Sequence, residues 1–211
     1  GQDLKAWSEE RGGVGSVPLA ARLEIVAQIA DALQAAHDAG VIHRDVKPGN
    51  ILVSQKEGSP KPTPIPSQEG SREVGDAVKS SPPLEGLGVG SVAVKLTDFG
   101  IGQVVSAEAM AGVTNAGFTQ TIVAESSSSQ TGSQMYMAPE LLAGKSASTR
   151  SDIYSLGVVL YQLLVGDLTR PLTTDWADHI SDPLLRDDLK HCFAGNPQDR
   201  FSGAGQLAEN L

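Results

Sequence analysis

The sequence predicts an α+β fold that is mainly α-helical, with a few short strands and one buried central helix. Apolar residues recur at helical spacing over residues 18–39, which is typical of an amphipathic helix. The stretch 153–165 is apolar all round, as in a helix enclosed by a protein core. Short alternating or β-branched runs at 51–53 and 91–97 indicate strands. With 211 residues, of which 40% are hydrophobic, the chain can bury a core, and we expect one domain over 1–211.

Composition and charge exclude several classes of partner. The net charge of -9 and the pI of about 4.8 argue against a nucleic-acid or anionic-membrane surface. Cys192 is the only cysteine, so no internal disulfide can form and we expect a reducing, cytoplasmic setting. No apolar run reaches the roughly 18 residues that a membrane helix needs. The chain opens on Gly1 instead of Met, so a parent protein could carry a membrane anchor elsewhere.

The elements follow from local signals along the chain. Pro18 suits the first turn of the long helix, and Gly40 suits its C-terminal cap. Residues 54–90 are rich in Pro, Ser, Glu and Gly without periodicity, which indicates a flexible insertion. A second long loop, 101–131, is rich in Ser, Thr, Gly and Gln. We expect helices at 2–10, 18–39, 139–142, 152–165, 183–193 and 202–211, and strands at 41–42, 51–53 and 91–97.

A cluster of polar and charged residues at 43–50 lies between apolar 41–42 and apolar 51–53. Charges beside a core cost free energy unless they meet partners. One interpretation is a charged turn between two short strands. The other is a catalytic loop with a base, a phosphate-directed cation and a metal ligand, because the pattern H-R-D-x-x-x-x-N is matched at His43, Arg44, Asp45 and Asn50.

Other motifs follow in an order that selects the second interpretation. Asp98-Phe99-Gly100 follows a strand, Ala138-Pro139-Glu140 precedes helices, Asp152 begins the buried helix, and Arg200 lies near the end. Together with HRDVKPGN they resemble the C-terminal lobe of eukaryotic-type (Hanks-type) serine/threonine protein kinases. The sequence around residues 149–161 is similar to that of bacterial members of this family. The resemblance implies a kinase-like C-terminal lobe with short strands around the catalytic loop. It also implies ATP and Mg²⁺ as cofactors, and a protein substrate with a Ser or Thr acceptor.

The resemblance assigns roles at the reaction centre. Asp45 would accept or orient the proton of the substrate hydroxyl, and Lys47 would reach the γ-phosphate as a point charge. Asn50 and Asp98 would supply oxygen ligands to Mg²⁺. Asp3 lies where relatives contact the nucleotide ribose, although a helix-start carboxylate explains it nearly as well.

Regulatory and structural roles are implied in the same way. The activation segment would span 98–140, and Arg44 would bind it after phosphorylation. Ser133 would contact the catalytic Asp and Lys and line the substrate groove. Glu140 and Arg200 would form a buried ion pair, whereas Asp152 would hold the backbone around His43. The candidate phosphosites, each of which could also be a merely solvated residue, are Thr119, Thr121, Thr131 and residues 126–129.

A complete kinase also needs a glycine-rich loop and a strand lysine before the catalytic loop. Residues 13–17 begin like a glycine-rich loop, but Pro18 stands in place of the third glycine and no strand flanks them. Residues 92–95 resemble the strand with the lysine, but they lie directly before Asp98-Phe99-Gly100. We therefore expect that the N-terminal lobe is absent from this chain and must be supplied as a partner. Since ATP binds between the two lobes, the isolated chain is expected to bind ATP weakly and to transfer phosphate poorly.

Two alternatives use the same motifs. The first is a catalytically dead kinase-like scaffold, or pseudokinase, and intact Asp45, Lys47, Asn50 and Asp98 argue against it. A glycine-rich loop and a V-A-x-K strand upstream of residue 1 would exclude the scaffold. The second is a small-molecule phosphotransferase with a similar loop. The segment 138–140 and the helix that follows it form a peptide-binding platform in protein kinases, which argues against that alternative.

Overall fold

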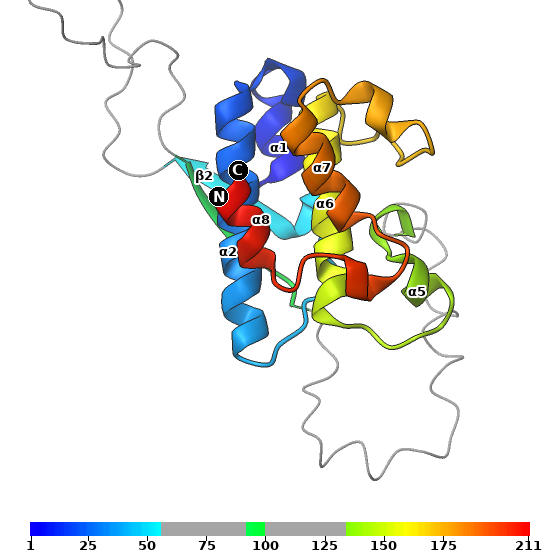
Figure 1. Ribbon diagram of the computed structural model, residues 1–211. Helices are drawn as coiled ribbons and strands as arrows, with labels where there is room; N and C mark the ends of the chain where they lie inside the picture. The colour runs from blue at the N-terminus through cyan, green and yellow to red at the C-terminus, as the bar shows by residue number, and fades with distance from the viewer. Residues whose placement is uncertain (56–91, 100–133) are drawn as a thin grey trace, which may run out of the picture.

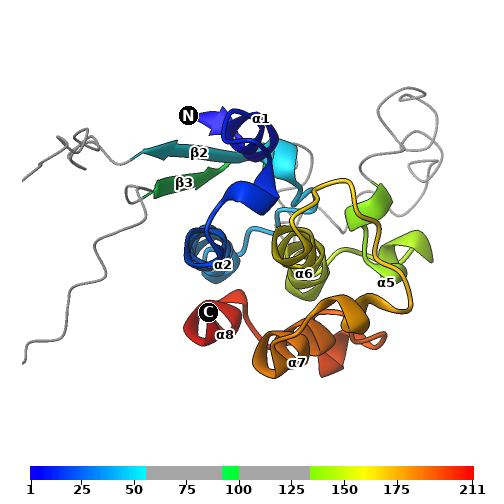
Figure 2. The same ribbon diagram turned by 90° about the horizontal axis from the view of Figure 1, so that it is seen from above.

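The computed structural model describes residues 1–55, 92–99 and 134–211, and these form three layers (Figures 1 and 2). Seen from above, a small sheet and helix α1 (Leu4–Glu9) lie on one side. The long helices α2 (Leu19–Asp38) and α6 (Thr149–Val165) pack side by side in the middle. Helices α7 (Pro183–Cys192) and α8 (Ala204–Asn210) form the third layer, with α7 against α6 and α8 against α2. A mainly helical α+β fold was expected, and the described part has it.

The sheet has three antiparallel strands in the order β1-β2-β3. Strand β1 (Gln2–Asp3) pairs with β2 (Ile51–Gln55), which pairs with β3 (Val92–Leu96). Ile51 lies opposite Leu96, and the pairing continues one step further because the Thr97 amide donates to the Asn50 carbonyl at 2.9 Å. This end of the β2–β3 ladder therefore brings Asn50 beside the residue that precedes Asp98.

Helix α2 ends in a turn that overrides the strand predicted at 41–42. Gly40 has φ 76° and donates its amide to the His37 carbonyl at 2.9 Å. The Val41 amide donates to the Ala36 carbonyl at 2.8 Å, so the last carbonyls of the helix are satisfied in a Schellman motif. Because this closure uses the Val41 amide, the residue has no strand partner. The prediction of a strand at 41–42 was wrong.

Helix α6 begins earlier than predicted and is almost wholly buried. Ser148 and Ser151 form a capping box before an apolar stretch that ends at Gly166, whose φ of 83° suits a glycine cap. Gly157 has a packing reason, because a Cβ there would lie 2.5 Å from the Cβ of Cys192. The absent side chain lets α7 approach α6 closely. Cys192 itself is fully buried, as expected of a core residue.

The shorter elements complete the helical side. The predicted helix at 2–10 begins only at Leu4, because the Asp3 side chain caps it and residues 2–3 join the sheet. Helices α7 and α8 confirm the predictions at 183–193 and 202–211 with slightly shorter bounds. The remaining elements of the described ranges are α5 (Pro139–Leu142) and the 3₁₀ turns η1 (Val14–Ser16), η2 (Pro48–Asn50), η4 (Gln134–Tyr136), η5 (Trp176–His179) and η6 (Pro197–Asp199).

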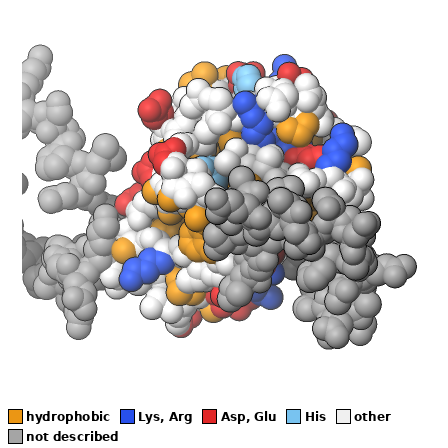
Figure 3. Space-filling view, turned by 90° about the horizontal axis from the view of Figure 1, so that it is seen from below, with side chains coloured by type: hydrophobic (Ala, Val, Ile, Leu, Met, Phe, Trp, Pro, Cys, Tyr) orange, Lys and Arg blue, Asp and Glu red, His pale blue; other side chains and the backbone are white. Residues whose placement is uncertain are grey.

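The surface of the described part carries both signs of charge. Figure 3 shows acidic and basic side chains on one face, with most of the visible hydrophobic side chains in its left half. None of the helices that the structure describes is long and apolar enough to cross a membrane.

Candidate active site

The backbone of the loop 43–50 is held by a carboxylate from the central helix. Asp152 is 1% exposed, and its two oxygens accept the amides of His43 at 2.8 Å and Arg44 at 2.7 Å. The Nε2 of His37, at the end of α2, lies 2.9 Å from one of the same oxygens. Arg44 has φ 70°, a left-handed conformation that a non-glycine residue adopts at a cost. The paired amide contacts with Asp152 stabilise that conformation.

His43 connects the loop to the strand that leads to Asp98. It is fully buried, and its Nε2 lies 2.9 Å from the Thr97 carbonyl oxygen. Because a carbonyl can only accept, Nε2 carries the proton, and Nδ1 accepts the Asp45 amide at 3.3 Å. Burial lowers the pKa of His43, although the Thr97 contact and nearby carboxylates oppose the shift. The ring also packs on Phe99, with 4.6 Å between ring centroids.

Asp45, Lys47 and Asn50 form a compact group at the mouth of the loop. The Nζ of Lys47 lies 2.7 Å from Oδ2 of Asp45. The Nδ2 of Asn50 donates to the same Oδ2 at 2.9 Å and to the Asp45 carbonyl at 2.7 Å. Among the described residues, none donates to Oδ1 of Asp45. The side chain of Asp45 is 40% exposed, so a hydroxyl from outside can reach the carboxylate.

The donor set fits a magnesium ion. The Nδ2 of Asn50 is occupied by Asp45, so Oδ1 of Asn50 is the atom left to bind a cation. Asp98 is exposed, and the Thr97–Asn50 hydrogen bonds bring it to the same end of the hairpin. The described part holds no cluster of three or more His, Cys, Asp and Glu side chains suited to a metal. Mg²⁺ does not require one, because it usually takes one or two protein carboxylates together with phosphate and water.

Asp3 has an observed local role. Its Oδ1 accepts the Ala6 amide at 2.9 Å and caps α1. Strand β1, which carries Asp3, also contacts η2 of the loop. The helix-start interpretation is therefore present in the structure, and the residue also lies close to the loop.

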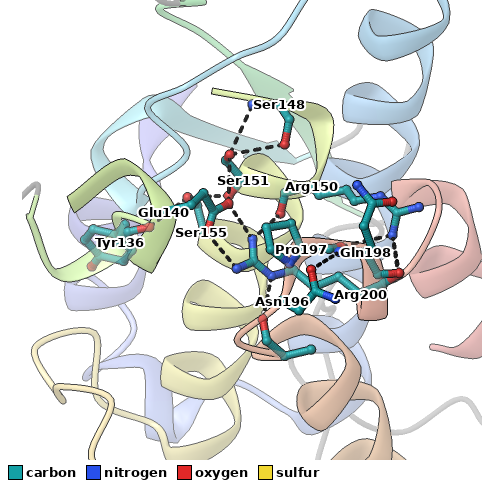
Figure 4. A network of polar contacts seen from close by, with 11 residues as sticks. Tyr136, Glu140, Ser148, Arg150, Ser151, Ser155, Asn196, Pro197, Gln198 and Arg200 are labelled. Carbon is teal, nitrogen blue, oxygen red and sulfur yellow. Dashed lines mark hydrogen bonds and ion pairs between the residues drawn. The ribbon is translucent and has the colours of Figure 1, made fainter. Parts of the chain in front are cut away.

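Glu140 and Arg200 meet in a buried, bidentate ion pair (Figure 4). Nη1 of Arg200 donates to Oε1 of Glu140 at 2.7 Å, and Nη2 donates to Oε2 at 2.8 Å. Ser151, on α6, donates its hydroxyl to Oε1 at 3.0 Å. Burial by itself would raise the pKa of Glu140, but the contacts with Arg200, a backbone amide and Ser151 together lower the pKa below its usual value. The pair joins the segment at 138–140 to the far end of the chain.

Gln162 is a buried polar residue whose contacts sequence reasoning missed. It is fully buried in α6, and its Oε1 accepts the Tyr136 hydroxyl at 2.9 Å. Its Nε2 donates to the Arg170 carbonyl at 3.0 Å and contacts the Met135 sulfur at 3.1 Å. The interruption of the apolar run 153–165 by one amide was the signal that could have found it.

Several predicted features lie outside the described residues. The insertion at 54–90 falls there except for its first two residues, and so does most of the activation segment at 98–140. The regulatory candidates that lie outside are Thr119, Thr121, Thr131, Ser133 and residues 126–129.

Comparisons with known proteins agree on one family. The family model of the protein kinase domain matches residues 2–208. Serine/threonine-protein kinase PknA of Mycobacterium tuberculosis is 32% identical over 210 residues, which cover 92% of this chain and 37% of PknA. Pkn1 of Myxococcus xanthus is 34% identical over 168 residues, covering 80% of this chain and 17% of Pkn1. The chain thus spans well under two thirds of the length of these relatives.

The fold has solved counterparts. The crystal structure of the Mycobacterium tuberculosis PknI kinase domain superposes with a TM-score of 0.58 at 23% sequence identity. The match covers all of this chain and 61% of the PknI chain. At that identity the likeness concerns the fold alone.

Proposed function

The chain belongs to the protein kinase family, and from this premise we propose that it transfers the γ-phosphate of ATP to Ser and Thr hydroxyls of protein substrates. The observation that carries the proposal is the group at Asp45. One carboxylate oxygen is held by Lys47 and Asn50, and the side chain of Asp45 as a whole remains 40% exposed. A scaffold without catalysis has no need for this arrangement.

The chemistry asks for positioning and charge neutralisation more than for covalent steps. The Lys47 and Asn50 contacts fix the Asp45 carboxylate, so that Oδ1 can accept the proton of a substrate hydroxyl. Lys47 is 27% exposed and can extend its charge to a transferred phosphoryl group. Asn50 and Asp98 would hold Mg²⁺, which neutralises phosphate charge when it is bound. We propose a second role for Asp3, in which the carboxylate oxygen that does not cap α1 contacts the ribose of ATP.

We propose that the activation segment regulates this centre. Arg44 follows His43 and precedes the base, so a phosphate bound to its guanidinium would be linked directly to the catalytic loop. The proposed phosphorylation sites are Thr119, Thr121, Thr131 and residues 126–129, and Ser133 is proposed to contact Asp45 and Lys47 from the substrate side.

A labelling experiment tests the function. With γ-labelled ATP and Mg²⁺, the full natural protein should place label on serine and threonine of a general acceptor protein, and not on tyrosine. Asp98→Asn should lower the rate by about a hundredfold or more, because a metal contact contributes several kcal/mol to charge stabilisation. Asp31→Asn, which changes an exposed Asp on α2, should leave the rate unchanged. Magnesium-independent labelling, or full activity of Asp98→Asn, would refute the proposal.

We also propose that these 211 residues form the C-terminal lobe of a kinase domain. The match to 61% of a solved kinase domain and the single small sheet of the described part support this. A polypeptide of residues 1–211 should therefore bind ATP at least about tenfold more weakly than the full natural protein, measured by calorimetry, because one wall of the nucleotide site is missing. Equal affinity, or robust Asp45-dependent turnover by residues 1–211, would contradict it.

A further inference from the structure

Arg150 makes contacts that neither its position in the sequence nor the proposed chemistry explains. It is the second residue of α6, where a positive charge is disfavoured by the helix dipole. Its Nη1 donates to three carbonyl oxygens, those of Pro197 at 3.1 Å, Gln198 at 3.1 Å and Arg200 at 2.7 Å (Figure 4). These carbonyls lie at and just beyond η6, so the guanidinium fastens this turn to the start of α6.

The contact is reciprocal. Nη1 of Arg200 donates to the Arg150 carbonyl at 2.9 Å, while Nη1 of Arg150 donates to the Arg200 carbonyl at 2.7 Å. Each guanidinium thus fixes the backbone of the other residue. The Nε of Arg200 also donates to the Ala194 carbonyl at 2.9 Å, so little freedom remains for the side chain that binds Glu140.

The first turns of α6 carry this restraint to the segment around residue 140. Ser151, next to Arg150, donates to Glu140, and the Ser155 hydroxyl donates to the Tyr136 carbonyl at 2.7 Å. Residues 136–140 are therefore held by hydrogen bonds from Ser151, Ser155 and the Arg200 guanidinium. All three donors depend on where the N-terminal end of α6 lies.

We propose that Arg150 is a positioning residue that sets the geometry of residues 136–143 through Arg200 and the first turns of α6. In the proposed kinase reaction, that segment receives the protein substrate. The kinetic test of this role therefore rests on the proposed function. Loss of the Arg150 guanidinium then weakens substrate binding and leaves the nucleotide side, with Asn50 and Asp98, unchanged.

The first measurement does not depend on activity. In the full natural protein, Arg150→Met should speed hydrogen exchange of the Leu142, Ala143 and Lys145 amides by about tenfold. The reason is that the variant loses the three hydrogen bonds that fix the backbone around Arg200, whose guanidinium holds Glu140. Arg150→Lys, which keeps the charge and one donor nitrogen, should give a smaller increase. Arg186→Met is the matched control. Arg186 lies on α7, and its guanidinium is also bound to a backbone carbonyl, that of Ile180.

The second measurement is kinetic. Arg150→Met should raise KM for a protein substrate about three- to tenfold, with KM for ATP and kcat changed less than twofold. Unchanged exchange at 142–145, or an equal change in Arg186→Met, overturns the proposal. If the wild type transfers no phosphate, the proposed function fails while the exchange measurement still decides the role of Arg150. A rise in KM for ATP equal to that for protein substrate would also overturn it.

Discussion

Replacing Asp45 by Asn should lower kcat by about 10²- to 10⁴-fold, which is the range supplied by a positioned general base. The substitution keeps the size of the side chain and the acceptor for Asn50, but it removes the charge that pairs with Lys47 at 2.7 Å. An amide oxygen cannot take the proton of a substrate hydroxyl at neutral pH. The measurement is the initial rate of phosphate transfer by the full natural protein at saturating ATP and substrate.

The same variant should still bind nucleotide and stay folded. Asp45 is 40% exposed, so losing its charge leaves no buried cation without a partner. We expect the ATP affinity to stay within about threefold of the wild type and the thermal midpoint to change little. Asp31→Asn serves as the matched control on the exposed face of α2. Wild-type kcat in Asp45→Asn would show that the proton goes elsewhere, whereas an unfolded variant would assign Asp45 a structural role.

The regular elements could be predicted because their signals are local. The apolar run at 153–165 predicted α6, and the helical spacing at 18–39 predicted α2. Neither prediction needed any knowledge of the neighbouring elements. The two-residue strand β1 could not be found in this way, because only its pairing with β2 defines it. Residues 41–42 were misjudged for a related reason. An apolar pair resembles a strand, but the closure of the preceding helix uses its amide.

The residues of the candidate site also differ in how far local sequence predicts them. The group from His43 to Asn50 is contiguous, so its residue types and spacing pointed to its chemistry directly. The pairing of Glu140 with Arg200, 60 residues apart, followed only from the family resemblance. Arg150 was missed because its partners are backbone carbonyls, which any residue type supplies. Contacts of that kind leave no side-chain pattern in a single sequence.

Removing Arg200 should be the most destabilising single change among the charged residues discussed. Arg200→Met leaves the buried Glu140 carboxylate without its bidentate partner, and breaking such a pair typically costs about 3–5 kcal/mol. Urea unfolding at pH 7 measures the loss, and Arg186→Met should cost about 1 kcal/mol or less. The double variant Glu140→Leu/Arg200→Met should recover part of the loss, but not all of it, because the Ala194 and Arg150 carbonyls also lose a donor. A double variant as unstable as Arg200→Met alone would contradict this account of the pair.

Acid titration gives the same pair a second, independent signature. The folded pKa of Glu140 lies below its usual value of about 4.3, because the charge of Arg200 and the hydrogen bonds to the carboxylate together outweigh the effect of burial. The stabilisation from its charge is therefore fully present above about pH 4.3 and is lost as the pH falls through the lower, folded pKa. Glu140→Gln removes this titration. The difference in unfolding free energy between wild type and Glu140→Gln should stay constant from pH 7 to about pH 5 and then shrink steadily towards pH 3. A difference that grows on acidification would mean that burial dominates and that Glu140 is protonated more readily in the folded protein than in the unfolded chain.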